Sequence, residues 1–141
     1  MSAVLVSSSR PVLVTGGAGF IGANLTDRLL SSGKSVIVFD DLSRSGVERN
    51  VEYLRAKHGS KFELVIADVR DPTQIRAAVR RASAVYHFAA QVAVTTSLAE
   101  PRRDFEINAL GTLNVLEAVR ETNRIHPCTL HVDEQSLRRN R

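Results

Sequence analysis

The alternation of short β-branched runs with longer helical patterns is the feature of this sequence that most constrains its fold. Runs rich in Val, Ile and Phe predict strands, buried on both faces, at residues 12–15, 35–39, 62–66 and 84–88. Apolar residues at helical spacing predict helices over residues 19–32, 47–57, 72–82 and 101–122. Strands joined through helices run parallel, with right-handed crossovers. We therefore expect an α/β fold, a Rossmann-type doubly wound sheet of about four strands in the order 3-2-1-4.

The composition excludes several other classes of protein. The chain has 141 residues, of which 43% are hydrophobic and 24% charged, and this is typical of one globular domain. A formal charge of +4, without tryptophan or a basic helix, does not indicate a nucleic-acid surface. The N-terminus has neither a signal-peptide pattern nor a membrane-spanning run. The single cysteine, Cys128, excludes an internal disulfide and favours the cytoplasm.

The composition changes near residue 123. Residues 1–10 are expected to form a flexible N-terminus and residues 11–123 the Rossmann half. Residues 124–141 lose the apolar rhythm, so we interpret them as the ending of a truncated or frame-shifted chain, with one strand candidate at 128–132. Without further strands, residues 84–88 would form a new apolar sheet edge, which predicts poor solubility or a homodimer.

The histidines and the cysteine do not predict a metal site. His126, Cys128 and His131 have neither the spacing of a zinc knuckle nor a fourth ligand. His87 ends an expected buried strand, where a hydrogen-bonded core histidine is favoured over a catalytic one.

Four glycines occupy the turn between the first expected strand and helix, in the stretch VTGGAGFIG at residues 14–22. Glycine within a helix or strand is destabilising by roughly 0.5–1 kcal/mol relative to alanine. Gly16 permits a tight turn, Gly19 lets the backbone approach a phosphate, and Gly22 lets the helix pack close to the strand. The N-terminus of the helix presents unpaired N–H groups and a positive dipole end. The stretch therefore predicts a diphosphate site, although any tight strand-to-helix turn could use such glycines.

Acidic residues follow the second expected strand, about twenty residues beyond the glycine turn. Asp40, with Asp41 beside it, is expected to accept hydrogen bonds from the adenosine ribose and to repel a ribose phosphate, which favours NAD over NADP. Arg44 complicates this preference, because a guanidinium can also hold a phosphate. The alternative is that the two acids only form a turn or a helix cap and that Arg44 is solvated.

The ends of the third and fourth expected strands face the same edge of the sheet. Asp68 is expected to meet the adenine amino group, with a turn residue as the alternative. Ala89 and Ala90 are small enough for a cofactor to lie against the backbone.

Five motifs in order, TGGAGFIG, FDDLSRSG, ADVRD, HFAAQVAV and NALGTLNVLEAVR, resemble the extended short-chain dehydrogenase/reductase family, the NAD-dependent nucleotide-sugar epimerases and dehydratases. The resemblance covers about residues 11–123. It implies NAD as the cofactor, and it implies that the cofactor-binding residues beside the three glycines are Phe20, Ile21, Asp40, Asp41, Leu42, Ser43, Arg44, Ser45, Asp68, Val69, Phe88, Ala89, Ala90, Gln91 and Asn108. The hydroxyls of residues 95–97 either face the sugar or shape the following helix.

In this family a Tyr-x-x-x-Lys pair with a preceding Ser or Thr moves the protons. The only tyrosines here, Tyr53 and Tyr86, are not followed by lysine four positions later, so we assign no catalytic residue. The stretch from residue 87 to 123 is most similar to epimerases of CDP-linked sugars, which implies a CDP-sugar as the partner of the full-length enzyme. We expect the NAD-binding N-terminal portion of a nucleotide-sugar epimerase, inactive alone. The alternatives are a UDP-glucose 4-epimerase or 4,6-dehydratase portion, or a non-catalytic dinucleotide-sensing module.

Overall fold

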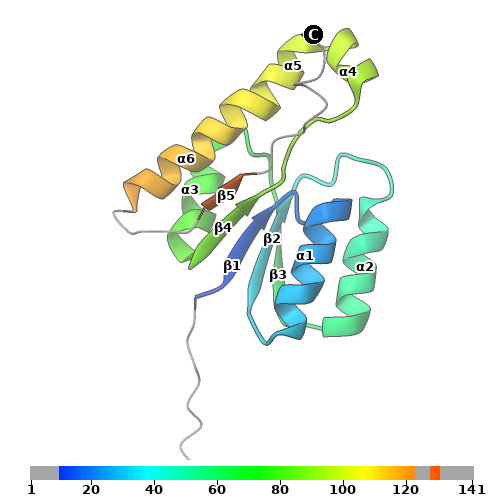
Figure 1. The fold of residues 1–141 in the computed structure, drawn as a ribbon, viewed down its shortest axis with the longest axis vertical. Coiled ribbons are helices and arrows are strands. Elements are labelled where there is room, and N and C mark those ends of the chain that lie inside the picture. Colours follow the sequence, from blue (N-terminus) through cyan, green and yellow to red (C-terminus); the bar gives the residue numbers. More distant parts are fainter. Residues whose placement is uncertain (1–9, 123–127, 131–141) are drawn as a thin grey trace, which may run out of the picture.

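A five-stranded parallel sheet organises the computed structural model, which describes residues 10–122 and 128–130 (Figure 1). The strands are β1 (Val12–Thr15), β2 (Val36–Asp40), β3 (Phe62–Ile66), β4 (Ala84–His87) and β5 (Cys128–Leu130). Their order is β3-β2-β1-β4-β5. The predicted order 3-2-1-4 is confirmed, and the structure adds a fifth strand beside β4.

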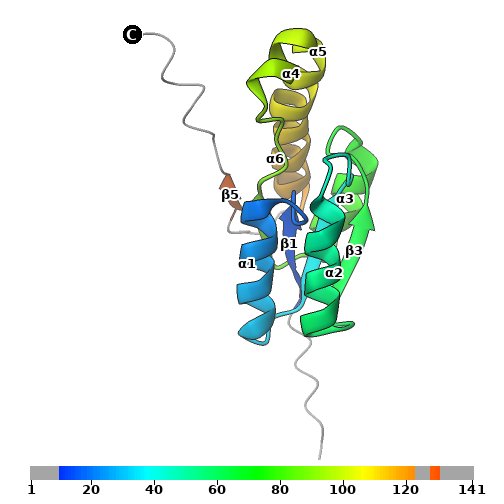
Figure 2. The same cartoon turned by 90° about the vertical axis from the view of Figure 1, so that its right-hand side faces the viewer.

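The helices flank the sheet on both faces. They are α1 (Phe20–Ser31), α2 (Val47–His58), α3 (Pro72–Arg81), α4 (Val94–Ala99), α5 (Pro101–Phe105), the π-helix η1 (Glu106–Leu110) and α6 (Gly111–Glu121). Figure 2 shows α1 and α2 on one side of the sheet and α3 and α6 on the other. The helix expected over residues 101–122 is present as three connected segments, and α4 was not predicted. Among the described helices, none has the length and hydrophobicity needed to cross a bilayer.

Each face of the sheet has its own apolar core. Leu13, Ile37 and Val85 pack with α3 and α6, whereas Val14 and Val38 pack with α1 and α2. Successive strand residues point to opposite faces, which explains why β1 and β2 are apolar throughout. The predicted burial on both faces is therefore confirmed for these two central strands.

The two edges of the sheet differ from the prediction. Burial on both faces is wrong for β3, where Ile66 is 64% exposed, because β3 is an edge strand with one neighbour. Exposed Glu63 on this strand forms an ion pair with Arg81, and charged side chains discourage edge-to-edge pairing. The expectation that residues 84–88 form the other edge is also wrong, because β5 pairs with β4 in parallel, with Val85 opposite Cys128.

Local signals fix the helix ends. Asp71 is the N-cap of α3, where its carboxylate accepts from the N–H groups of Thr73 and Gln74, and Pro72 occupies the first helical position. Gly33 follows α1 with a φ of 84°. The expectations for residues 1–9 and most of the tail, including the end of the strand candidate at 131–132, lie outside the described residues.

Candidate functional site

An open pocket lies at the carboxyl edge of the sheet, where ligands bind in open α/β folds. The predicted contact residues that line it are Gly16, Gly19, Asp40, Asp41, Ser43, Arg44, Asp68, Val69, Phe88, Ala89, Ala90 and Gln91. The predicted residues that do not line it are Phe20, Ile21, Gly22, Leu42, Ser45 and Asn108. The structure therefore brings the ends of four strands together around one cavity.

The glycine turn owes its shape to close backbone contacts. Gly16 has a φ of 66°, and a Cβ there would lie 2.7 Å from the N of Ala89. A Cβ on Gly22 would lie 2.1 Å from the carbonyl oxygen of Gly16, so α1 can begin against the turn only with glycine at this position. Gly19 differs, because its Cβ would meet only the Gly16 oxygen, at 3.2 Å. Packing thus requires glycine at positions 16 and 22, whereas Gly19, which lines the pocket as Gly16 does, is less constrained by its neighbours.

The N-terminus of α1 opens onto this pocket. Gly19 is the N-cap and offers no side chain to the first-turn N–H groups, which carry the positive end of the helix dipole. Phe20 and Ile21, which the resemblance assigned to the cofactor, are 81% and 47% exposed on the first turn of α1. This end of the helix is suited to bind an anion.

Asp40 joins the second strand to the glycine turn. Its Oδ2 accepts from the N–H of Ala18 at 3.0 Å, and its Oδ1 accepts from the N–H of Leu42 at 2.9 Å. Burial raises the pKa of this carboxyl. Each carboxylate oxygen keeps acceptor capacity beyond these bonds, so Asp40 can accept hydrogen bonds from two neighbouring hydroxyl groups.

The loop after β2 is shaped by its own side chains. Leu42 has a φ of 55°, in the left-handed region, a conformation that clusters at functional sites in non-glycine residues. Asp41 accepts from the N–H and the hydroxyl of Ser43, so it also has the turn-forming role considered from the sequence. Arg44 is exposed at the pocket wall, and within the described part of the chain its guanidinium makes no ion pair. Ser45 lies outside the lining.

Asp68 lines the pocket and has the turn-forming role considered from the sequence. Its carboxylate lines the pocket, and it also closes a turn by accepting from the N–H of Arg70 at 2.8 Å. The Arg70 guanidinium, 2.6 Å away, lowers the pKa of Asp68, and it also reaches Glu106 at 3.5 Å. Asp68 is therefore held as a carboxylate beside Val69.

Asn108 reaches the pocket only through another residue. It donates to the carbonyl of Gln91 at 3.0 Å and accepts from the N–H of the same residue at 2.8 Å. Gln91 lines the pocket and Asn108 does not. Asn108 lies in the π-helix η1, a type of distortion frequent at functional sites.

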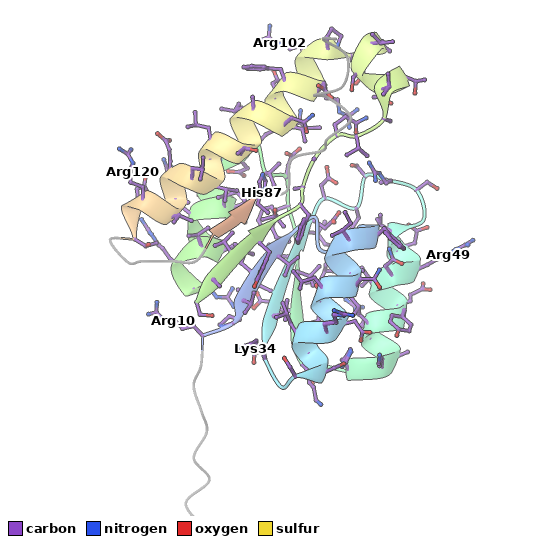
Figure 3. The ribbon with its side chains drawn as sticks, in the orientation of Figure 1. Arg10, Lys34, Arg49, His87, Arg102 and Arg120 are labelled. Carbon is purple, nitrogen blue, oxygen red and sulfur yellow. The ribbon has the colours of Figure 1, made fainter. Side chains whose placement is uncertain are left out.

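His87, the last residue of β4, is labelled in Figure 3, and its ring is hydrogen-bonded to Thr15 at the end of β1 and to Thr112 of α6. The Thr112 hydroxyl donates to the carbonyl of Asn108, so its oxygen accepts from Nε2–H of His87 at 3.0 Å. Nδ1 of His87 then accepts from the Thr15 hydroxyl at 2.6 Å. Burial lowers the pKa of His87 to about 4, so the ring is neutral at physiological pH. A neutral ring engaged at both nitrogens is a structural bridge, as the sequence favoured.

Several features of the site were missed or left open by the sequence. Four further residues line the pocket, namely Phe39, Val47, Ala67 and Ile107. Phe39 and Ala67 adjoin predicted acids at strand ends, so position alone could have identified them, whereas Ile107 is brought there only by the helix packing. Residues 95–97 lie inside α4 and away from the lining, and Ser97 donates to Asp104 at 2.7 Å. No group of three metal-ligating side chains occurs within residues 10–122 and 128–130.

Residues 13–132 match the GDP-mannose 4,6 dehydratase family. The chain is 45% identical over 114 residues to CDP-paratose 2-epimerase of Salmonella typhi, an alignment that covers 79% of this chain and 33% of the relative.

Solved structures of the same kind share the fold. UDP-glucose 4-epimerase of Thermus thermophilus, solved in complex with NAD, is 41% identical with a TM-score of 0.68 over 79% of this chain and 34% of that one. The Stenotrophomonas maltophila UDP-glucose 4-epimerase, with bound NAD and formylated UDP-arabinopyranose, is 34% identical with a TM-score of 0.72 over 81% and 34%. The chain thus spans about a third of the length of these relatives. It belongs to the GDP-mannose 4,6 dehydratase family of nucleotide-sugar epimerases and dehydratases and corresponds to their N-terminal Rossmann portion.

Proposed function

We propose that this chain binds NAD as the N-terminal portion of a nucleotide-sugar epimerase. The observation that carries the proposal is the junction of Asp40 with the glycine turn, where one carboxylate oxygen binds the N–H of Ala18 beside the N-terminus of α1. A diphosphate acceptor and a ribose-recognising acid are thereby adjacent at one sheet edge. This combination is the requirement for a dinucleotide.

The pocket supports one arrangement of the cofactor. The diphosphate lies at Gly19, the adenosine ribose at Asp40, and the adenine beside Asp68 and Val69. The second nucleoside then extends across β1 toward the segment from residue 88 to 91, where Phe88, Ala89, Ala90 and Gln91 line the wall. The remaining predicted contacts at residues 20–22, 41–45 and 108 surround this path. NAD supplies a hydride acceptor, and these residues bind and orient it.

NAD is preferred over NADP in this proposal. The raised pKa of Asp40 reflects its burial, and two backbone N–H groups stabilise its charged form. A ribose phosphate would bring two further negative charges against this carboxylate. The exposed guanidinium of Arg44 offsets part of that repulsion, so discrimination between the two cofactors is finite.

The substrate of the complete protein is proposed to be a CDP-linked sugar. The support is the 45% identity to CDP-paratose 2-epimerase, which exceeds the 43% identity to the UDP-glucose 4-epimerase of Mycolicibacterium smegmatis. UDP-glucose 4-epimerase is therefore the second candidate. The sequence contains no Tyr-x-x-x-Lys pair, so we propose that these 141 residues do not epimerise a sugar unaided.

Self-association and location complete the proposal. Phe105, Leu113 and Leu116 are 66%, 50% and 41% exposed along α5 and α6, and an exposed apolar stripe of this kind favours a homodimer. Sedimentation of the Leu113→Glu variant tests this, with a monomer expected.

The single cysteine supports a reducing compartment and hence the cytoplasm.

Calorimetric titration with NAD tests the proposal directly. Replacing Asp40 with Ala is expected to weaken NAD binding by about 1–3 kcal/mol, the scale of hydrogen bonds to a charged group. Asp27→Ala is the matched control, because Asp27 binds Lys57 and His58 between α1 and α2 outside the pocket. A folded wild type without a heat signal at millimolar NAD, or unchanged affinity in Asp40→Ala, contradicts the assignment. Epimerisation by the purified chain contradicts its proposed inactivity.

A further inference from the structure

Three asparagine side chains hold the backbone of the loops around the pocket. Asn50 of α2 donates to the carbonyl of Ala18 at 2.7 Å. Asn114 of α6 donates to the carbonyl of Val69 at 3.0 Å. Asn108 of η1 binds both the N–H and the carbonyl of Gln91. We call Asn50, Asn108 and Asn114 the pocket asparagines.

Each of these bonds joins a helix to a different strand-end loop. Ala18 belongs to the turn after β1, Val69 follows β3, and Gln91 follows β4. Val69 and Gln91 line the pocket, and Ala18 lies between two glycines that line it. None of the pocket asparagines lines the pocket. They therefore act on the cavity through the backbone and not by touching its contents.

The loops need such restraint for physical reasons. Ala18 and Val69 are buried, so their carbonyl groups require partners within the protein. The turn around Ala18 is rich in glycine, which has more conformational freedom than other residues. Fixing this freedom in the folded protein removes an ordering cost from the binding step.

We propose that the pocket asparagines are positioning residues that hold the three loops in the ligand-binding geometry before a dinucleotide arrives. The proposal rests on the proposed NAD function for the identity of the ligand. It gives a role to Asn50 and Asn114, and it makes the contribution of Asn108 to binding indirect, through Gln91.

Amide hydrogen exchange in the NAD-free protein tests the restraint separately from binding. In Asn50→Ala, exchange at the N–H groups of Ala18 and Gly19 is expected to rise about tenfold, with the amides after β3 unchanged. In Asn114→Ala the pattern reverses, and exchange rises at Arg70 and Asp71, whose N–H groups bond to Asp68. Such local patterns distinguish loop restraint from general destabilisation, which accelerates exchange throughout.

NAD titration of the same variants tests the consequence for binding. Each is expected to raise the NAD dissociation constant about three- to tenfold, as for the loss of one net hydrogen bond. Asn24→Ala is the matched control, because among the described residues the Asn24 amide bonds only the Phe20 carbonyl of its own helix. It should change neither exchange in the loops nor affinity. Because Asn114 is buried, thermal unfolding accompanies each measurement, and the half-buried Asn50 decides the test if Asn114→Ala does not fold.

The outcomes separate the two proposals. Uniform acceleration, or no local change, overturns the restraint. Local acceleration with unchanged NAD affinity overturns its role in positioning the ligand. A wild type that does not bind NAD overturns the proposed function and the positioning of this ligand together, while the exchange pattern still decides whether the asparagines hold the loops.

Discussion

The turn after β1 and the segment after β4 line the same pocket but are constructed in opposite ways. The first owes its geometry to missing side chains, because glycines allow backbone atoms of Gly16, Gly22 and Ala89 to approach closely. The second is held by side chains that arrive from the distant helical segments η1 and α6, through the His87–Thr112 and Asn108–Gln91 hydrogen bonds. Asp40 and Asn50 also bond to Ala18, but the close backbone contacts are peculiar to the first wall, whereas the second depends on side-chain hydrogen bonds.

This difference predicts different responses to mutation. Close backbone packing has little room to relax, so an added methyl group must displace main-chain atoms. A hydrogen-bonded wall loses its partners one at a time, and each loss has the modest net effect of a single bond unless a buried group is left unpaired. We therefore expect substitutions in the glycine turn to cause large losses in the free energy of unfolding, and substitutions that remove one hydrogen bond near the end of β4 to cause smaller losses.

The largest effect is expected for Gly22→Ala. Its new Cβ would lie 2.1 Å from the Gly16 carbonyl oxygen and 2.7 Å from the Cα of Gly17. Relief requires the start of α1 to move away from the turn, at a cost of about 3 kcal/mol or more in the free energy of unfolding. Urea denaturation followed by circular dichroism measures this loss.

A glycine remote from the pocket provides the control for this substitution. Gly33 also lies in a tight turn, with a φ of 84°, but a Cβ added there would meet nothing within 4 Å. Gly33→Ala should therefore show only the left-handed backbone penalty of about 1–2 kcal/mol. Equal losses in the two variants would mean that close packing at Gly22 has no special weight.

The second effect is the pH dependence of the free energy of unfolding that arises from His87, the last residue of β4. Its pKa is lowered from 6.5 to about 4 in the folded protein by burial. As the pH falls below 6.5, the unfolded chain takes up a proton that the folded chain does not, so stability present above pH 6.5 is lost toward pH 4. Between pH 7.5 and 5 this linkage amounts to about 2 kcal/mol.

The His87 contribution is obtained as a difference between two proteins. His87→Gln removes this titration, while the other histidines of the chain remain in both proteins. Its free energy of unfolding should therefore fall less than that of the wild type between pH 7.5 and 5, a window above the titration of most carboxylates. Parallel pH profiles for the two proteins would show that His87 is not held neutral.

The two walls also explain how much of the site could be predicted. The glycine turn is visible in sequence because the positive φ of Gly16 and the contact of Gly22 with Gly16 depend on neighbours in the chain, although the contact of Gly16 with Ala89 does not. Asp40 was predicted from its spacing to belong to this site, and it lines the pocket and accepts from the N–H of Ala18. Local geometry of this kind leaves a pattern in the sequence.

The second wall leaves no such pattern. The bonds of Thr112 to His87 and of Asn108 to Gln91 join residues 25 and 17 positions apart, so their partners are known only when η1 and α6 are placed on the sheet. The same reason explains why Ile107 was missed and why Asn108 was assigned a direct contact. The exposed β3 was mispredicted because an apolar run does not reveal whether its strand is central or at an edge.

A third, smaller effect is expected at Thr112. Thr112→Val keeps the shape of the side chain but leaves Nε2–H of buried His87 without its acceptor. The expected loss in the free energy of unfolding is about 1–2 kcal/mol. Thr112→Ser retains the hydroxyl and should recover most of it in the same denaturation assay. A serine variant as unstable as the valine variant would assign the loss to the methyl group instead of the hydrogen bond.

The smallest effect is expected on the glycine side, where tight packing has left one polar group unsatisfied. Thr26 of α1 is fully buried, and its hydroxyl has no hydrogen-bond partner among the described residues. A buried hydroxyl without a partner is destabilising, so Thr26→Val, which keeps the branched shape, should raise the free energy of unfolding by up to about 1 kcal/mol. Thr122→Val is the matched control, because the half-buried Thr122 hydroxyl donates to the Val119 carbonyl and its removal should not stabilise. A gain at Thr26 and a loss at Thr112 from the same substitution would demonstrate that one side of the pocket is held by packing and the other by hydrogen bonds, whereas losses at both positions would remove that distinction.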